Sequence, residues 1–277
     1  VFTKLIIPMS NKNKTKIIGI LNLTHDSFFD GGKYLSKKQA LQHATNMIDS
    51  GVDIIDIGAE SSKPGFSDVD VSLQLDRIIP IMEKLRNLND KIILSVDTRS
   101  SIVASEAIKR GASIINDVSS GTHDSDMFDI VAEAGVEIII THMPSGHKRK
   151  QTIVSKNIMK DIKKYLTERI RVAVNSGIKR KKIIVDPGIC FGKKGNDNVK
   201  ILQNLSFLVD TFNRVCLGAS NKKFSSKLLK NYTKKDLYIP SIVTTTKAVM
   251  SSVEFVRVHD VSITNDVLKI CNKTLSV

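Results

Sequence analysis

Eight short apolar runs alternate with amphipathic stretches along this chain, and that alternation limits its possible folds more than any other feature. The runs are rich in β-branched residues and occupy positions 17–21, 54–57, 92–96, 114–115, 138–140, 183–185, 215–217 and 255–258. Runs that are apolar at nearly every position are typical of strands buried on both faces, as in a parallel sheet. The sequence therefore predicts an α/β fold.

The stretches between the runs carry apolar residues at helical spacing, most clearly over 36–50, 73–88, 102–110, 127–134 and 159–174. Several end at a glycine of the kind expected at helix C-caps, namely Gly51, Gly111, Gly135 and Gly177. Eight strands alternating with helices predict a (β/α)8 TIM barrel, which usually has about 250 residues. A doubly wound open sheet is the alternative, although no G-x-G-x-x-G motif follows the first run.

The length of 277 residues suits one large domain, and 41% hydrophobic with 25% charged residues excludes a disordered chain. We expect an N-terminal extension over 1–15 and a single barrel domain over 16–277. No apolar run approaches the roughly 18 residues of a membrane span, and Leu5-Ile6-Ile7 is too short for a signal peptide. We therefore expect a cytoplasmic protein without a membrane partner. The three scattered cysteines exclude a disulfide scaffold.

The net charge of +14 raises the question of nucleic-acid binding. The basic residues lie mainly in clusters such as 147–150 and 179–182, Trp is absent, and aromatic residues make up 5%. Platforms for stacking bases are therefore not expected. We predict no nucleic-acid partner, and interpret the charge as a lysine-rich surface; a diffuse field that attracts anionic substrates is the alternative.

Polar residues follow the apolar runs, at the point where each predicted strand ends. They are Asn22, residues 60–65, Asp97, residues 116–117, His142, Asp186, residues 220–222 and residues 257–260. In a barrel these positions converge on one rim, at the carboxyl ends of the strands. Each one alone is explained by a helix cap or a turn. Eight in succession favour a shared site.

The residue types at this rim indicate two kinds of ligand group. Asp97, Asn116, Asp186 and Lys222 offer two carboxylates, an amide and an ammonium, a set that suits a flat heterocycle with a donor edge and a carbonyl edge. Residues 257 and 259 lie two apart on one strand, so Arg and His there would face the same side and bind an anion.

Asn22 offers a neutral oxygen, which is adequate for Mg²⁺ held otherwise by phosphate oxygens and water. The segments 25–32 and 61–65 contain glycine and follow the first two runs, so we expect them to form mobile loops over the site.

At these positions the sequence resembles the dihydropteroate synthase family, pterin-binding enzymes of the folate pathway that sulfonamides inhibit. The matching segments are GILNLTHDSFFDGG (19–32), DIGAESSKPG (56–65), SVDT (95–98), INDVSSG (115–121), HM (142–143), DPGICFGK (186–193), GASNKKF (218–224) and RVHDV (257–261). The resemblance covers residues 16–275 and implies a (β/α)8 barrel. It also implies condensation of 6-hydroxymethyl-7,8-dihydropterin diphosphate with p-aminobenzoate, by an SN1-like departure of diphosphate.

The resemblance further implies residue roles. Substrate-binding positions carried over from the family motifs are Phe28, Ser62, Lys63, Asp97, Asn116, Asp186, Phe191, Gly218, Ser220, Lys222, Arg257 and His259. Of these, Asp97, Asn116, Asp186 and Lys222 would form the pterin pocket. Asn22, Ser62, Arg257 and His259 would form the site for diphosphate and Mg²⁺, with Asn22 as metal ligand. Asn22, Lys222, Arg257 and His259 are the candidate catalytic residues.

The chain departs from the family pattern at His25, Phe29, Lys63, Thr141, Asn221 and Lys223. Lys63 stands where the family has arginine; it keeps the charge but loses the planar fork, which weakens positioning of an anion. We interpret these departures as drift in a working enzyme, and a paralogue with reduced activity is the alternative.

Two other functions compete with a synthase. A methyltetrahydrofolate-type pterin-binding barrel would share the pterin pocket but would need no diphosphate site. A non-catalytic basic protein would bind nucleic acid in a salt-dependent way and would not bind pterin. The resemblance also implies a homodimer and, in some members, fusion to hydroxymethyldihydropterin pyrophosphokinase, with which the Val1 start is compatible.

Overall fold

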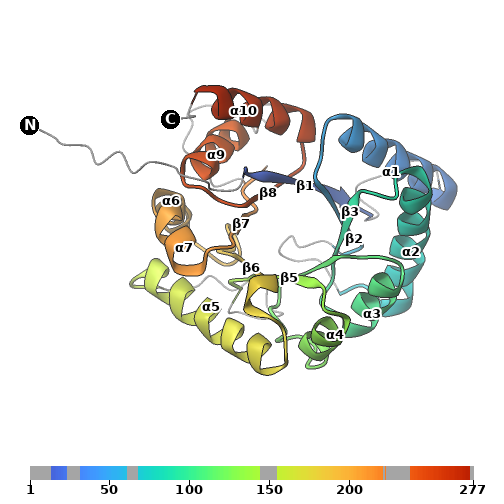
Figure 1. The fold of residues 1–277 in the computed structure, drawn as a ribbon, viewed down its shortest axis with the longest axis horizontal. Coiled ribbons are helices and arrows are strands. Elements are labelled where there is room, and N and C mark those ends of the chain that lie inside the picture. The colour runs from blue at the N-terminus through green and yellow to red at the C-terminus, as the bar shows by residue number, and fades with distance from the viewer. Residues whose placement is uncertain are drawn as a thin grey trace, which may run out of the picture.

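A computed structural model of the chain describes residues 14–23, 32–60, 68–143, 155–220, 222 and 238–274. Parallel strands form a ring, and helices surround it (Figure 1). The strands are β1 (Lys16–Asn22), β2 (Ile54–Gly58), β3 (Ile93–Asp97), β4 (Ile114–Asp117), β5 (Glu137–Thr141), β6 (Ile183–Asp186), β7 (Cys216–Leu217) and β8 (Phe255–Val258). The α-helices described are α1 (Gly32–Asp49), α2 (Val71–Leu88), α3 (Ser101–Lys109), α4 (Met127–Ala134), α5 (Ile158–Asn175), α6 (Gly195–Gln203), α7 (Leu205–Phe212), α9 (Tyr238–Met250) and α10 (Val261–Thr274).

The sheet closes on itself, which excludes the open doubly wound alternative. Its strand order is β6-β5-β4-β3-β2-β1-β8-β7. The two end strands then meet at a parallel bridge between Val185 and Val215, where the Val185 N–H donates to the Arg214 carbonyl at 3.0 Å. The chain is therefore a (β/α)8 barrel, as the alternation of apolar runs predicts.

Both faces of the strands are buried, but against different partners. Alternate residues point outward and pack under the helices, which share one large apolar cluster with them. The others point into the barrel, where they form a separate plug of Ile18, Ile54, Ile114, Ile139, Ile184, Cys216 and Phe255. Polar interior positions follow this plug toward the carboxyl ends of the strands. The barrel interior is therefore apolar over the plug and polar at the carboxyl ends of the strands.

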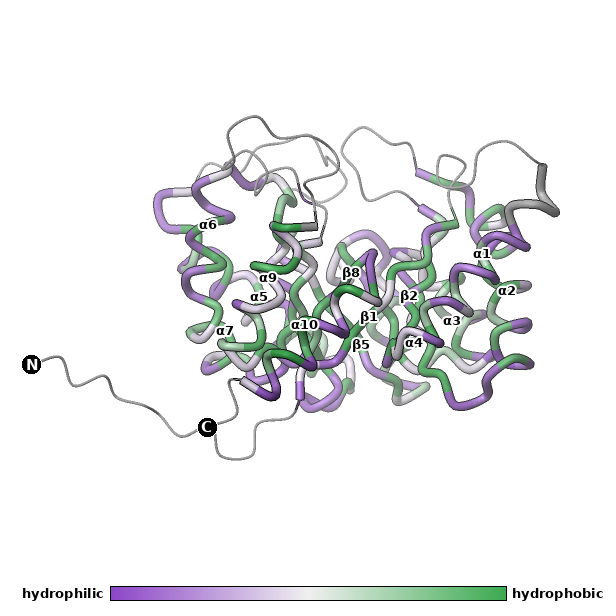
Figure 2. The backbone as a smooth tube through the Cα atoms, turned by 90° about the horizontal axis from the view of Figure 1, so that it is seen from above, coloured by the Kyte–Doolittle hydropathy of each residue, from purple (hydrophilic) through white to green (hydrophobic). Residues whose placement is uncertain are grey.

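The helices predicted from spacing are present, with their ends moved by a few residues. Gly51, Gly111, Gly135 and Gly177 all have positive φ, between 63° and 101°, as expected at C-caps. Along the helices the chain alternates between hydrophilic and hydrophobic residues (Figure 2). Among the helices of the described residues, none combines the length and the apolar character that crossing a membrane requires.

Gly19 lets two helices approach β1 closely. A Cβ at this position would lie 2.8 Å from Met47 Sδ on α1 and 3.0 Å from Val261 Cγ2 on α10. Both distances are shorter than ordinary Cβ contacts, so a side chain here would force Met47 and Val261 to move. The glycine in the first apolar run is thus a packing requirement of the barrel wall.

Arg214 stabilises the end of the barrel opposite the polar interior. Its guanidinium binds both oxygens of Glu254, at 2.8 and 2.9 Å, and reaches Glu137 Oε1 and the Lys181 carbonyl, each at 2.8 Å. Glu137 starts β5 and Glu254 precedes β8, so one side chain joins segments that flank the β6–β7 closure. The two carboxylates raise the pKa of Arg214 although burial opposes them.

We expect Arg214→Met to lower the free energy of unfolding by about 2–3 kcal/mol, because two partly buried carboxylates lose their counter-charge. Arg171→Met is the control: among the described residues Arg171 pairs only with Glu168, on the exposed face of α5, and its loss should cost less than about 0.5 kcal/mol. Urea unfolding of both variants measures the difference. Equal stabilities would show that Arg214 does not hold the closure.

Candidate active site

The carboxyl ends of the strands bring most of the predicted site residues to one mouth. Asn22 on β1 is in register with Gly58 on β2, which pairs with Asp97 on β3, which in turn pairs with Asn116 on β4. These residues form one interior row across four neighbouring strands. The geometric expectation that distant polar residues converge therefore holds for this half of the rim.

Arg257 crosses the interior and binds two carboxylates. Its Nε donates to Asp56 Oδ2 at 2.7 Å, and its Nη2 donates to Asp97 Oδ2 at 2.8 Å. Burial would lower the pKa of Arg257, but the two carboxylates overcome it and raise the pKa. Arg257, expected to bind an anion, thus contacts Asp97, one of the groups expected to bind a heterocycle.

Asp56 is the central acceptor of this network, and sequence reasoning assigned it no role. Its side chain is fully buried and also accepts hydrogen bonds from Ser95 Oγ at 2.6 Å and Asn116 Nδ2 at 3.0 Å. One signal could have revealed it: a carboxylate inside the apolar run 54–57 requires buried partners. The identity of those partners depends on which strands become neighbours.

Asp186 is held at the end of β6 by a tight turn. The Gly188 N–H donates to Asp186 Oδ1 at 2.6 Å, and Gly188 has a φ of 71°. A Cβ on Gly218, at the end of β7, would lie 3.3 Å from Asp186 Oδ2, so this glycine leaves room for the carboxylate. Burial raises the pKa of Asp186, while the Gly188 N–H and the charge of Lys222 oppose that rise.

Lys222 and Phe191 lie together beside Asp186. Lys222 Nζ is 5.2 Å from the centre of the Phe191 ring, and burial lowers the pKa of Lys222. The charges of Arg257, Asp186 and Asp97 all act on this ammonium, which places it at the same mouth.

Lys193 is a buried cation in the segment between β6 and α6, and the sequence reasoning gave it no role. Its Nζ donates to the carbonyls of His142 at 2.9 Å and Gly188 at 2.7 Å, and so pins the turn that carries Asp186. Burial lowers the pKa of Lys193 to about 7, against the attraction of Asp186.

This pKa predicts a specific pH dependence of stability. The ordinary pKa is 10.5, so between about pH 7 and 10 the unfolded chain holds a proton that the folded chain has lost. The energetic cost of burying charged Lys193 is full below pH 7 and falls as the pH rises. Relative to Lys193→Met, the wild type should gain up to about 1.4 kcal/mol per pH unit in this window. Urea unfolding of the wild type and Lys193→Met at pH 6, 8 and 9.5 tests this pH dependence. A difference in the free energy of unfolding that stays constant across these pH values would mean that Lys193 stays charged.

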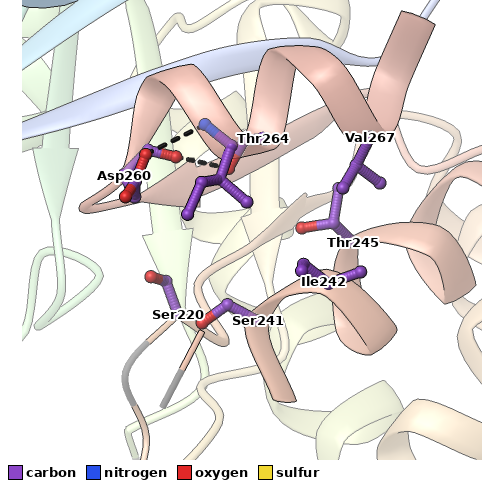
Figure 3. Close-up of a pocket in the computed structure, with 8 residues that line it drawn as sticks. Ser220, Ser241, Ile242, Thr245, Asp260, Thr264 and Val267 are labelled. Atoms are coloured by element: carbon purple, nitrogen blue, oxygen red, sulfur yellow. Dashed lines mark hydrogen bonds between the residues drawn. The ribbon is translucent and has the colours of Figure 1, made fainter. Parts of the chain in front are cut away.

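His259 and Ser220 lie at another edge of the mouth. The Ser220 Oγ is 3.3 Å from both the backbone N and the Nδ1 of His259. Ser220 also borders a cavity of about 100 Å³ between α9 and α10, lined in part by Ser241, Thr245 and Asp260 (Figure 3). Hydroxyl groups and apolar side chains share this lining.

A larger cavity, of about 360 Å³, lies among the segments that follow β2, β3 and β4. It is lined in part by Glu60, Asp68 and Arg99, with the buried Arg99 Nη2 binding Glu60 Oε2 at 3.0 Å and Asp68 Oδ1 at 2.8 Å.

Of the predicted site residues, Phe28, Ser62 and Lys63 lie outside the described residues.

Asn22 fits a cation whose other ligands come from a bound substrate. Within the described ranges, no group of three or more His, Cys, Asp or Glu side chains could hold a metal ion. Asn22 is half-buried, and its Oδ1 faces the interior row, 3.8 Å from where a Cβ on Gly58 would lie. One neutral oxygen suits Mg²⁺ bound chiefly by phosphate oxygens and water.

A (β/α)8 barrel with a buried polar site at the carboxyl ends of its strands is typical of enzymes that act on small ligands. The sequence profile of the family described as "Pterin binding enzyme" matches residues 18–259. The chain belongs to this family.

Individual relatives agree with that assignment. A dihydropteroate synthase of Staphylococcus haemolyticus is 38% identical over 90% of this chain and 91% of its own length. A mitochondrial folate synthesis bifunctional protein of Arabidopsis thaliana is 35% identical over 98% of this chain, which spans about half (52%) of that protein. The crystal structure of a Clostridium difficile dihydropteroate synthase in the presence of pteroic acid superposes with a TM-score of 0.89, at 36% identity, covering 97% of this chain and 99% of that one.

Proposed function

We propose that this chain is a dihydropteroate synthase, which joins 6-hydroxymethyl-7,8-dihydropterin diphosphate to p-aminobenzoate and releases diphosphate. One observation carries the proposal: in a pterin-binding barrel, a buried acceptor set and a half-buried cation pair share one mouth. Asp186 and Asn116 supply the acceptors, and Arg257 and Lys222 supply the cations. Pteroic acid, present with the Clostridium relative, has a pterin joined to p-aminobenzoate.

The pterin ring would bind between the strands that carry the acceptors. Asp186 accepts from the donor edge of the ring through both carboxylate oxygens, a charge-assisted arrangement. Asn116 and Asp97 add further polar contacts, and Lys222 faces the carbonyl side. Phe191 lies within reach of Lys222 and offers an apolar face to the flat ring.

The chemistry follows from where charge develops. The bond between the exocyclic methylene and the diphosphate oxygen breaks, and its electron pair leaves with diphosphate. The ring delocalises the resulting positive charge, and the amine lone pair of p-aminobenzoate then forms the C–N bond and releases its proton to water. An aryl amine attacks without prior deprotonation, so this path needs no dedicated general base.

Donors fixed in advance lower the energy of the departing anion. Arg257 and His259 would face the diphosphate, together with Ser62. Bound Mg²⁺ would neutralise part of the diphosphate charge, with Asn22 as its protein ligand.

The aryl amine would lie toward the outer rim. Ser220 borders the hydroxyl-lined cavity beside His259, on the side where a carboxylate would need donors. Phe28 and Lys63 are proposed for the same substrate from the family motifs. The homodimer and Mg²⁺ dependence stay predictions.

A turnover assay tests the proposal. The protein is mixed with the pterin diphosphate and labelled p-aminobenzoate, with and without Mg²⁺, and we expect equal amounts of dihydropteroate and diphosphate in the Mg²⁺ arm. No product at any enzyme concentration would refute it. Pterin binding without turnover and without diphosphate affinity would favour the methyltetrahydrofolate-type barrel. Salt-dependent nucleic-acid binding without pterin binding would favour the basic binding protein.

A further inference from the structure

The Asp56 carboxylate determines which atom of Asn116 faces the ligand. An ionised carboxylate only accepts hydrogen bonds, so the amide nitrogen must be the atom that faces it. The Asn116 Nδ2 indeed donates to Asp56 Oδ2 at 3.0 Å. The amide oxygen therefore points away from Asp56, and it accepts no hydrogen bond within the part of the chain that the structure describes.

The same carboxylate orients Arg257. Its Nε binds Asp56 and its Nη2 binds Asp97, which fixes the plane of the guanidinium. In the described part of the chain Nη1 donates to no protein acceptor, so it is the donor that remains for a ligand. Asp56 is fully buried and lies two residues before Gly58 on β2, one interior layer deeper than the row of Asn22, Asp97 and Asn116. The plane of the guanidinium is therefore fixed from the inner side of the mouth.

We propose that Asp56 is a positioning residue that fixes the donor and acceptor pattern of the mouth, with an acceptor at Asn116 Oδ1 and a donor at Arg257 Nη1. This role rests on the proposed function, because the acceptor matches the donor edge of a pterin and the donor matches a diphosphate. Asp56 touches neither substrate and acts only through these two side chains.

Asp56→Asn tests the role directly. An asparagine there has one acceptor and one donor group, so it cannot accept from Ser95, Asn116 and Arg257 together. The Asn116 amide then turns its nitrogen toward the ligand or loses its partner. We expect the Kd for 6-hydroxymethylpterin, measured by calorimetry, to rise about 30-fold or more.

The exchange Asp56→Asn with Asn116→Asp separates positioning from a general loss of structure. The new asparagine donates to the new carboxylate, and position 116 again presents an oxygen to the ligand. Arg257 Nε shares Asp56 Oδ2 with Asn116 and loses its acceptor in both variants that carry Asn at position 56, so the exchange restores the acceptor at position 116 and not the orientation of Arg257. We expect the double variant to bind 6-hydroxymethylpterin within about fivefold of the wild type and more tightly than either single variant, because the paired hydrogen bond is restored. A merely structural role gives no such rescue.

Asp117→Asn is the matched control. Asp117 is also fully buried, but its hydrogen bonds from Ser119 and Gly121 stay within its own turn. This variant should lose stability and keep its pterin Kd within about twofold.

The outcomes distinguish the two claims. A wild-type chain that binds no pterin overturns the proposed function and the positioning role with it. Normal wild-type binding with an unchanged Kd in Asp56→Asn overturns the positioning role alone. If Asp56→Asn does not fold, the comparison is between the double variant and Asn116→Asp, and equal or weaker binding by the double variant overturns it.

Discussion

Asp186→Asn should lower the affinity for 6-hydroxymethylpterin by at least about 100-fold and leave the fold intact. In the variant, an amide NH2 replaces one carboxylate oxygen of residue 186. One N–H group of the pterin ring then loses its acceptor and faces another N–H donor in a buried site. A charge-assisted hydrogen bond contributes about 1.5–3 kcal/mol, and tenfold in affinity corresponds to about 1.4 kcal/mol. The remaining oxygen can still accept from the Gly188 N–H, so the turn that carries residue 186 survives.

The control for this prediction is Asp197→Asn. Asp197 is a similarly buried carboxylate in the first turn of α6. Within the described residues its side chain makes no hydrogen bond or ion pair with Asp186, although its charge acts on Lys193. Calorimetric titration of both variants, with thermal unfolding alongside, measures the contrast. If Asp186→Asn bound the pterin as the wild type does, the assignment of the pocket would be wrong.

Arg257→Lys should lower kcat/KM about 100- to 1000-fold, the loss typical of removing one fixed donor to a developing anion. Lysine keeps the charge but cannot span Asp56 and Asp97 while still offering a donor to diphosphate. The variant should also be less stable, because at least one buried carboxylate loses its hydrogen bond. Both effects arise from one guanidinium.

Single-turnover kinetics with saturating pterin diphosphate separates the two effects of this substitution, since it reports bond cleavage in the folded fraction only. Arg169→Lys is the control: Arg169 Nε donates to the Ser120 carbonyl away from the mouth, and its loss should leave the rate within about twofold. A single-turnover rate unchanged in Arg257→Lys would remove Arg257 from the proposed chemistry.

The strands could be predicted because burial on both faces leaves a direct trace in the sequence. Residues 54–57 and 183–185 are apolar at nearly every position, and the glycine caps mark the ends of helices between such runs. α9 left no such trace, since Val243 and three successive threonines favour strands and Pro240 lies in its first turn. Packing against α10 decides its conformation, and packing depends on the finished barrel.

The site was predictable to the extent that a barrel gathers strand ends. The convergence of Asn22, Asp97 and Asn116 follows from topology alone. The pairing of Arg257 with Asp56 and Asp97 does not, because it requires a long side chain to reach from β8 across the interior to β2 and β3. Lys193 was equally hidden, because its partners are backbone carbonyls that any sequence provides.

A structure of the chain with a non-hydrolysable analogue of the pterin diphosphate would show whether the barrel mouth binds this substrate. We expect the ring within hydrogen-bond distance of Asp186 and Asn116, and the phosphorus-bearing tail against Arg257 and His259. An analogue bound instead in the cavity beside Arg99, with the barrel mouth empty, would contradict this expectation.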